Sequence, residues 1–435
     1  MTSKEYFLKA YLIKSHIGEG HFSVVKKAVH RFTRETVAIK MVNKSNLSLP
    51  ECEQLSQEVA ILKLVQHPSV IRLYESFEDA HNIYMVLEYG KCNLDQYIKK
   101  HCKDDPISED TARIYFGQIV SAVSYFHRFR IVHRDLKPEN ILLCNQYKLC
   151  KIADFGLSRV SLDPTQDISA GTREYMAPET ILSKGEIGEK SDIWGLGIIL
   201  YMMVISEHPF HHRNPNEVVF KIIECIYDIP NRLSVDCQSL IRRILVKDPN
   251  KRATLEEIAV DPWLNVSKHN GHLGTGKNKL VTINREIHQV VIEKMVNNSM
   301  GTAHEINESL KEERFNQISA CYYLLAESLI KKTLKLDFPI QVNIDKSKKN
   351  VGTEYLTLAL LDLTSDVDIN LYVKQSHIKP KASTLKHKPI HLDSFIKPAL
   401  PQKSNLTKFY SNINLTDMNF EAENEPTLKD KPVFR

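Results

Sequence analysis

Residues 133–140, HRDLKPEN, bring together residue types that could carry out phosphate chemistry. Asp135 could accept a proton from a hydroxyl, Lys137 could neutralise a phosphate, and Asn140 could supply an oxygen to a divalent metal. Pro138 disfavours a regular helix here, so we expect a rigid loop that holds these groups within reach of one another. A solvated loop could carry the same mix by chance, so this stretch alone does not decide.

A glycine-containing turn lies near the N-terminus, where GEGHFSVV occupies residues 18–25. Because Gly18 and Gly20 lack a Cβ, backbone N–H groups between two strands could approach phosphate oxygens closely. Ser23 stands where the full G-x-G-x-x-G pattern has its third glycine. Taken alone the pattern is weak, and a plain glycine hairpin is the favoured interpretation.

A lysine ends the next β-rich run, VAIK at residues 37–40. The other members of this run are apolar, so the ammonium of Lys40 could enter a cleft near the glycine turn. The alternative is an ordinary edge-strand lysine. If Lys40 points inward it needs a partner, because an unpaired buried charge is costly, and Glu58 on the following helix is the expected one.

An acid follows the short strand-like run CKIA, at Asp154 in ADFGLSR. A carboxylate at the end of a strand can coordinate a divalent metal, and Asn140 offers a neutral oxygen for a second metal site. Each of these residues, taken alone, is more often a turn residue.

The order of elements around these residues predicts two lobes. Residues 11–100 alternate β-rich runs with turns, as in an antiparallel meander, and one helix interrupts them at 53–65, where Leu55 and Leu62 lie at helical spacing. From residue 107 helical periodicity dominates, and the apolar run 193–205 is typical of a buried core helix. A small strand-rich part followed by a larger helical part predicts an α+β fold with a cleft between its lobes.

Three further segments follow the predicted two-lobed domain, which ends near Leu264. Residues 265–281 carry Gly, Asn and Lys with little apolar content, as in a linker. We expect 282–332 to form a small domain of two or three helices, and 333–435 to be a low-complexity, mostly disordered tail. Within this tail, 353–363 is apolar enough to pack as either helix or strand. The helical domain carries two apolar stripes, Ile287, Val290, Val291 and Met295, and Phe315, Ile318, Tyr322, Leu325 and Leu329.

The composition is that of an ordinary soluble globular protein. The chain has 435 residues, 42% hydrophobic and 26% charged, and its net charge of +5 neither requires nor excludes an acidic partner. Its eight cysteines include no C-x-x-C pair, which favours a reducing compartment. We read no secretory signal at the N-terminus and no apolar run long enough to cross a membrane, and we expect a cytoplasmic protein with no nucleic-acid partner. The lysines of 379–389 could act in nuclear import, but a solvated tail is the favoured interpretation.

Taken in chain order, these features form a known signature. The glycine turn, strand lysine, helix glutamate, HRDLKPEN, DFG at 154–156 and APE at 177–179 follow one another at the spacing of the protein-kinase motifs. The chain resembles a eukaryotic protein kinase over residues 11–264. The resemblance implies a bilobal fold, with a β-rich N-lobe and a helical C-lobe, and transfer of the ATP γ-phosphate to hydroxyls of protein substrates. Lys40 and both catalytic acids are present, which favours an active enzyme over the alternative of a pseudokinase or a partner-docking scaffold.

The resemblance implies roles for these residues, with ATP and Mg²⁺ as cofactors. Lys40, held by Glu58, would grip the α- and β-phosphates. Asp135 would orient the substrate hydroxyl and accept its proton, while Lys137 neutralises the transferred phosphoryl group. The backbone of the glycine turn would cover the phosphates through Gly18, Glu19, Gly20, His21, Phe22 and Ser23.

Metal ligands and an adenine pocket are implied in the same way. Asp154 and Asn140 would hold Mg²⁺. Hydrogen bonds to adenine would come from the hinge backbone at Glu88 and Gly90, with Leu87 as the gatekeeper. The apolar walls of the adenine pocket would be Ile17, Val25, Ala38 and Leu142.

Further motifs indicate the substrate class and the framework of the fold. Lys137 in DLKPEN and Thr172 in GTREYMAPE resemble the corresponding residues of serine/threonine kinases rather than those of tyrosine kinases. Glu179 and Arg252 match a structural ion pair of the family, and Asp192 matches the acid that braces the catalytic loop.

Beyond the catalytic motifs, the chain resembles the AMP-activated-kinase-related group, and within it the sucrose-non-fermenting-related serine/threonine kinases. QEVAILKLVQHPSVIRLYESF, DIWGLGIILYMMV and the helical segment after the catalytic domain carry this resemblance. It implies that residues 282–332 form a ubiquitin-associated-like (UBA-like) domain. This domain has KMVNNS where ubiquitin-binding relatives carry a Met-Gly-aromatic loop. We therefore expect it to dock onto the kinase domain of its own chain rather than to bind ubiquitin.

The activation segment departs from the group. Alignment on APE places the activating threonine, the target of an upstream kinase, at Ile168, which cannot be phosphorylated. Our hypothesis is that a phosphate on Ser169, or Asp167 as a permanent anion, fills a basic pocket formed by Arg134 and Arg159.

The hinge segment YGKCNLDQYI also departs, because it is a residue shorter than that of the family. Asn93 stands near the position of an acid that, in relatives, contacts the ribose and a basic residue of the substrate. A preference for basic substrates is therefore in doubt.

Overall fold

The residues that the computed structural model describes all fall within 1–367. His21, residues 161–172 and 353–363, most of the expected linker and nearly all of the expected tail lie outside them. The described residues are 9–20, 22–102, 105–144, 147, 149–160, 173–182, 188–265, 281–283, 285–333 and 342–343.

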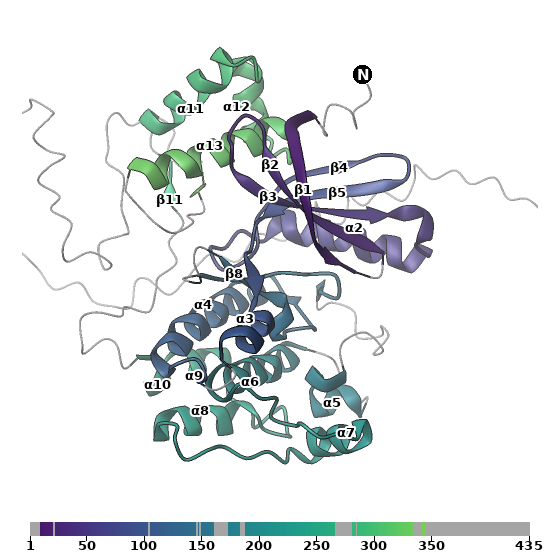
Figure 1. Ribbon diagram of the computed structural model, residues 1–435, viewed down its shortest axis with the longest axis vertical. Coiled ribbons are helices and arrows are strands. Elements are labelled where there is room, and N and C mark those ends of the chain that lie inside the picture. Colours follow the sequence, from purple (N-terminus) through teal and green to yellow (C-terminus); the bar gives the residue numbers. More distant parts are fainter. Residues whose placement is uncertain are drawn as a thin grey trace, which may run out of the picture. The chain divides into compact units, whose positions relative to one another are not determined.

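An antiparallel five-stranded sheet forms the N-lobe, with strand order β1-β2-β3-β5-β4 (Figure 1). Side chains alternate between the two faces of a strand. In β3, Val37 and Ile39 are therefore buried on one face, and Ala38 and Lys40 lie on the other. The strands are β1 (Tyr11–Glu19), β2 (Ser23–His30), β3 (Thr36–Asn43), β4 (Leu73–Glu78) and β5 (Asn82–Glu88).

One helix, α2 (Leu49–Leu64), packs against this lobe and carries Glu58. Its first turn is closed by Glu51, whose carboxylate accepts a hydrogen bond of 2.8 Å from the Ser48 N–H. Leu55 and Leu62 bury one face of the helix in the core that both lobes share. Because Glu58 lies on this buried face, its carboxylate is directed into the protein rather than toward water.

Helices dominate the C-lobe, so the predicted α+β bilobal arrangement is confirmed. The run 193–205 lies in α6 at the centre of the lobe, where Trp194 and Leu196 have no exposed surface. Within the part of the chain that the structure describes, no helix is both long and apolar enough to cross a membrane. The helices of the lobe are α3 (Leu94–His101), α4 (Glu109–His127), α5 (Pro178–Ile181), α6 (Glu189–Ile205), α7 (Pro215–Glu224), α8 (Val235–Ile244), α9 (Leu255–Ala259) and α10 (Pro262–Asn265).

Short strands and 3-10 turns hold the loops that carry the candidate site. β8 pairs with both β6 and β9, and β7 pairs with β10. HRDLKPEN joins β7 to β8, so each end of this loop is held by a strand that belongs to a sheet. The strands are β6 (Cys92–Asn93), β7 (Ile131–Val132), β8 (Ile141–Cys144), β9 (Leu149–Ile152) and β10 (Arg159–Val160), and the 3-10 turns are η1 (Lys44–Asn46), η2 (Pro138–Asn140) and η3 (Arg173–Tyr175).

The ion pair expected between Glu179 and Arg252 is present. The two terminal nitrogens of Arg252 donate to the two oxygens of Glu179 at 2.8 and 2.9 Å. The guanidinium lies 5.1 Å from the centre of the Trp194 ring and is buried. A bidentate pair with an aromatic neighbour ties α5 to α6 and to the end of the lobe.

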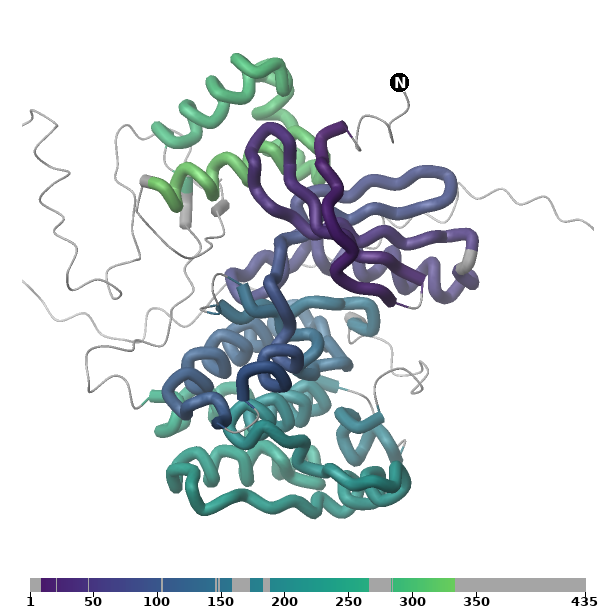
Figure 2. Tube along the Cα trace, in the orientation of Figure 1, coloured from purple at the N-terminus to yellow at the C-terminus, as the bar shows by residue number. Residues whose placement is uncertain are grey.

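Three helices follow the C-lobe in the sequence, α11 (Arg285–Asn297), α12 (Ala303–Lys311) and α13 (Gln317–Thr333), drawn in green in Figure 2. Val291 and Met295 of the first predicted stripe lie in their core. Two stripe residues were assigned wrongly. Val290 is 48% exposed, since it points about 100° away from Val291 and the contact with α13 does not extend that far around α11. Phe315 precedes α13 rather than lying on it.

The helix α13 contacts the face of the N-lobe sheet opposite to the one that packs on α2. Ala320 and Leu324 of α13 share a buried cluster with Val37 and Ile39 of β3. At one edge of this contact, the Ser76 N–H of β4 donates to the carbonyl oxygen of Phe315 at 3.0 Å. In addition, β11 (Val281–Thr282) pairs in parallel with β12 (Val342–Asn343), so two residues of the expected tail form a short strand.

Candidate active site

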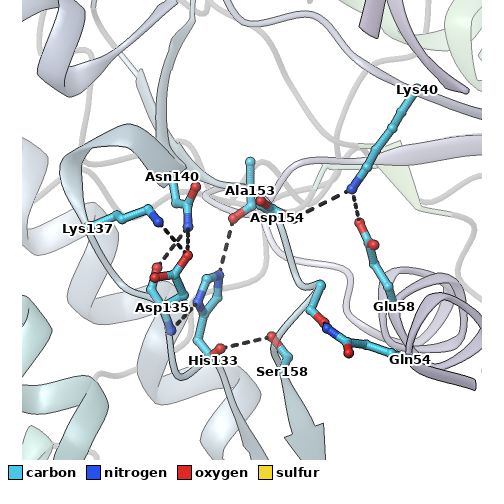
Figure 3. Close-up of polar contacts among 11 residues, drawn as sticks. Lys40, Gln54, Glu58, His133, Asp135, Lys137, Asn140, Ala153, Asp154 and Ser158 are labelled. Carbon is cyan, nitrogen blue, oxygen red and sulfur yellow. Dashed lines mark hydrogen bonds and ion pairs between the residues drawn. The ribbon is translucent and has the colours of Figure 1, made fainter. Parts of the chain in front are cut away.

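Three charged side chains meet between the lobes: Lys40, Glu58 and Asp154 (Figure 3). The ammonium of Lys40 lies 2.6 Å from Glu58 Oε1 and 3.5 Å from Asp154 Oδ1. Burial disfavours the charged lysine, but Glu58 and Asp154 outweigh it and raise the pKa of Lys40 above its ordinary value. Lys40 therefore stays an ammonium at physiological pH, and its expected pair with Glu58 is present.

Asp154 is held in the left-handed backbone region, with φ of 62°, just after β9. Burial works against its charge, but Lys40 and His133 hold the pKa of the Asp154 carboxyl below its ordinary value. Its side chain nevertheless remains 54% exposed, so its oxygens are oriented and still accessible to a ligand. A carboxylate of this kind, with the Asn140 amide oxygen, is a donor set that suits Mg²⁺.

A contact that the sequence reasoning missed joins α2 to the residues after Asp154. Gln54 Nε2 donates to the carbonyl oxygen of Gly156 at 2.5 Å (Figure 3). A Cβ on Gly156 would lie 3.2 Å from Asp154 Oδ1, so glycine lets this carboxylate lie close to the backbone of residue 156. The only signal in the sequence is that Gln54 precedes Glu58 by one helical turn.

The loop HRDLKPEN gathers its polar groups around the carboxylate of Asp135 (Figure 3). Asp135 Oδ2 lies 2.7 Å from Lys137 Nζ and accepts a hydrogen bond of 2.9 Å from Asn140 Nδ2. The same Nδ2 donates to the main-chain oxygen of Asp135 at 2.8 Å. Since its nitrogen is committed to Asp135, the oxygen of Asn140 is the atom that can ligate a metal.

Asp192 braces this loop, as expected. Its carboxylate accepts the N–H groups of His133 at 2.8 Å and Arg134 at 2.9 Å, and it lies 2.8 Å from His127 Nε2. Burial disfavours the charge, but the hydrogen bond from His127 helps to hold the pKa of Asp192 below its ordinary value. These contacts keep Arg134 in the left-handed region, with φ of 68°, and so set the direction of the chain into Asp135.

Hydrogen bonds connect the Asp135 loop to the turn that carries Asp154 (Figure 3). The Ala153 N–H donates to the Asn140 carbonyl oxygen at 2.9 Å, and His133 Nε2 lies 3.2 Å from the Ala153 oxygen. Ser158 Oγ donates to the His133 oxygen at 3.3 Å. The two halves of the site are therefore parts of one hydrogen-bonded framework.

The glycine turn lies at the end of the β1–β2 hairpin. Gly18 pairs with Val25, and the N–H of Gly20 donates to the oxygen of Ser23 at 2.8 Å. A Cβ on Gly20 would lie 2.7 Å from Ser23 Oγ, so any other residue here would have to turn the Ser23 hydroxyl away. Ile17, Glu19 and Phe22 border the same turn, and Ile17 is 40% exposed.

The residues predicted to form the walls of the adenine pocket lie on four strands, β1, β2, β3 and β8, and the predicted hinge lies at the end of β5 and just after it. Ala38 of β3 pairs with Leu87 of β5, which ends at Glu88. A Cβ on Gly90 would lie 2.9 Å from the side chain of Leu142, so glycine permits the hinge to pass close to this residue. Val25 pairs with Lys40, which joins the pocket to the phosphate-binding side.

Residues 11–264 match the family described as protein kinase domain. The chain belongs to the protein kinase family. Residues 289–327 of this kinase match a second family, described as the protein kinase SIK3 UBA domain, and they span parts of α11 and α13 and all of α12.

Named kinases are similar to this one over most of its length. The SNF-related serine/threonine-protein kinase of Rattus norvegicus is 40% identical over 331 residues, which are 74% of this chain and 43% of that protein. The SNF1-like protein kinase ssp2 of Schizosaccharomyces pombe is 36% identical over 323 residues, 74% of this chain and 54% of that one. The match thus spans about half the length of these relatives. With the UBA family match, they confirm the predicted AMP-activated-kinase-related group.

The regulatory residues of the kinase are described only in part. Ser169 and Thr172 lie outside the described residues, as does the side chain of Arg159, whose backbone pairs with Val132. The hypothesis of a filled basic pocket therefore stays a prediction. Asn93, in contrast, is described: its side chain accepts the Gln96 N–H at 2.8 Å and caps α3, a role that an aspartate would fill equally well.

Proposed function

We propose that this kinase transfers the γ-phosphate of ATP to serine and threonine hydroxyls of protein substrates. The observation that carries the proposal is the position of Asp135, 2.7 Å from Lys137, in a framework whose other half holds Lys40 and Asp154. Its relatives are named serine/threonine-protein kinases, which supports the same substrate class. No residue of the catalytic set is replaced, so nothing favours the pseudokinase alternative.

Each charged side chain has a place in this reaction. Lys40 binds the α- and β-phosphates, and Asp135 orients the substrate hydroxyl. As the hydroxyl oxygen bonds to the γ-phosphorus, Asp135 takes its proton, the bond from that phosphorus to the bridging oxygen breaks, and ADP leaves. Lys137 offsets the negative charge of the transferred group throughout the transfer.

We propose that Asp154 and Asn140 hold Mg²⁺. The accessible carboxylate of Asp154 and the committed nitrogen of Asn140 support this assignment. When bound, the ion neutralises charge on the phosphates. The protein fixes the directions of the two oxygen ligands. The N–H of Ala153, the residue before Asp154, donates to the carbonyl oxygen of Asn140.

Incubation of the purified full chain with labelled ATP, Mg²⁺ and casein tests this function. Phosphate should appear on serine and threonine and not on tyrosine, and it should disappear with EDTA. Asp154→Asn should weaken ATP binding about tenfold in the presence of Mg²⁺ but not in its absence. Asp110→Asn, which changes a 70% exposed carboxylate, is the matched control. ATP binding without any transfer would instead support the pseudokinase.

We further propose that the UBA-like domain docks onto the kinase domain of its own chain rather than binding ubiquitin. The buried cluster that joins Leu324 of α13 to Ile39 of β3 supports this proposal. So does Glu327, a carboxylate on α13 that is only 4% exposed. An isolated UBA-like domain would leave both groups open to water.

The substitution Leu324→Asp should lower the free energy of unfolding of the full chain by roughly 3 kcal/mol, because it places a charge in the contact. Val290→Asp is the matched control on the exposed side of α11 and should change it by less than about 0.5 kcal/mol. Thermal and denaturant unfolding measure both variants. Equal effects of the two substitutions, or binding of free ubiquitin by the wild-type chain, would contradict docking.

A further inference from the structure

A buried ion pair crosses from the UBA-like domain to the N-lobe. Arg72, which precedes β4, donates from Nη1 to Glu327 Oε1 of α13 at 2.7 Å. The second oxygen of Glu327 accepts the hydroxyl of Tyr74 at 2.9 Å. Both charged residues are less than a tenth exposed. The pair is therefore shielded from water, and removal of either partner leaves the other charge buried without this ion pair.

The backbone of Arg72 is itself part of the hinge support. Its carbonyl oxygen accepts the N–H of Glu88, the hinge residue at the end of β5, at 2.9 Å. The side chain of Glu88 is held from the other direction by Lys151, whose Nζ lies 2.8 Å from Glu88 Oε2 and donates to the Pro68 oxygen at 2.6 Å. The backbone of Arg72 is thus one of the contacts that fix the first hinge residue, together with Lys151 and the pairing of Glu88 with Val37 of β3.

The side chain of Arg72 depends on α13 for its environment. Its guanidinium lies 4.2 Å from the centre of the Tyr323 ring, one turn before Glu327 on the same helix. Burial raises the pKa of the Glu327 carboxyl, as does the nearby Glu88, and Arg72 limits the rise. Arg72 therefore favours the charged form of Glu327 against the effect of burial.

A cavity of about 230 Å³ lies beside the pair, between α2, β4 and the helices α12 and α13. Its lining includes Arg72, Tyr74 and Tyr323. Once Glu327 no longer holds it, the guanidinium of Arg72 has space to turn toward this cavity and toward water. A displacement of Arg72 shifts the carbonyl oxygen that fixes Glu88.

We propose that Glu327 is a positioning residue for nucleotide binding: by holding Arg72, it fixes the hinge backbone at Glu88 and so raises the affinity for adenine. The proposal rests on the proposed function, in which the hinge binds ATP. It makes the UBA-like domain a determinant of nucleotide affinity rather than of the phosphate-transfer step. Because binding free energies are reciprocal, a nucleotide on the hinge also strengthens the contact of α13 with the sheet.

Titration of the full-length kinase with adenosine and with MgATP tests the proposal. Adenosine reaches the hinge but lacks the phosphates that Lys40 and Mg²⁺ hold. Glu327→Gln should weaken both ligands by the same factor, about tenfold, and leave kcat at saturating ATP within about twofold of the wild type. Glu308→Gln removes an exposed carboxylate from α12 and is the matched control, with both affinities unchanged.

Each outcome is distinguishable. Wild-type protein that binds neither adenosine nor MgATP would refute the proposed function. Equal affinities of the wild type and Glu327→Gln for adenosine would overturn the inference alone. So would a loss confined to MgATP, since it would place the effect at α2 and Lys40 rather than at the hinge.

A measurement on the wild type needs no variant. Saturating adenosine should slow hydrogen exchange of the α13 amides near Glu327 by the factor that corresponds to the coupling, about tenfold. The amides of α8, which packs against α6 and α10 of the C-lobe, serve as the internal control. Protection of the hinge amide of Glu88 without any change in α13 would contradict the coupling.

Discussion

Asp135→Asn is expected to lower kcat about 10³-fold while the affinity for ATP changes little. The amide keeps the shape of the carboxylate, but it cannot take the proton of the substrate hydroxyl. It also removes the negative charge that lies 2.7 Å from Lys137. Steady-state rates at saturating ATP and a direct nucleotide titration measure the two quantities separately.

The control for this prediction is Asp236→Asn, the same chemical change at an exposed position in the first turn of α8. It should leave kcat unaltered. If Asp135→Asn kept more than about a tenth of the wild-type kcat, Asp135 would not be the proton acceptor, and the proposed mechanism would have to be abandoned.

Lys40→Met is expected to reduce kcat/KM about 10³-fold and, unlike the change at Asp135, to weaken ATP binding as well. The ammonium is the cation that separates Glu58 from Asp154. Without it, two carboxylates face the phosphate site, and the repulsion between them and the nucleotide adds to the lost contact. Initial rates over a range of ATP concentrations, together with a binding titration, give both effects.

Lys44→Met is the matched control, because it removes another lysine of the N-lobe that pairs with a glutamate. Lys44 lies 2.5 Å from Glu78, and the Glu78 side chain is 61% exposed, so this pair contributes little. ATP binding that survives in Lys40→Met but not in Lys44→Met would show that the nucleotide does not lie between β3 and α2.

The catalytic groups could be predicted from the sequence because their spacing is local. Asp135, Lys137 and Asn140 lie within one short loop that contains Pro138. The side chains of Lys137 and Asn140 can therefore both reach the carboxylate of Asp135. The alternation of apolar and polar residues in β3 likewise sets Val37 and Lys40 on opposite faces. Such patterns need no knowledge of distant residues.

Periodicity was less reliable at the level of single side chains. Both Val290 and Val291 fitted the predicted stripe of α11, yet only Val291 is buried. The width of the buried face depends on the partner helix, α13, and not on α11 itself. Phe315 fitted the stripe of α13 but lies before the helix, where its carbonyl oxygen binds β4.

The sequence alone determined the catalytic groups and the alternation of side chains between the two faces of each strand, because a few consecutive residues of a loop or a strand set them. Only the tertiary structure decided what the UBA-like domain contacts. Arg72 and Glu327 are separated by 255 positions, and a lone glutamate on a helix normally indicates a solvated face. Burial of that glutamate follows from the packing of α13 on the sheet, which brings the carboxylate to Arg72, whose backbone supports the hinge.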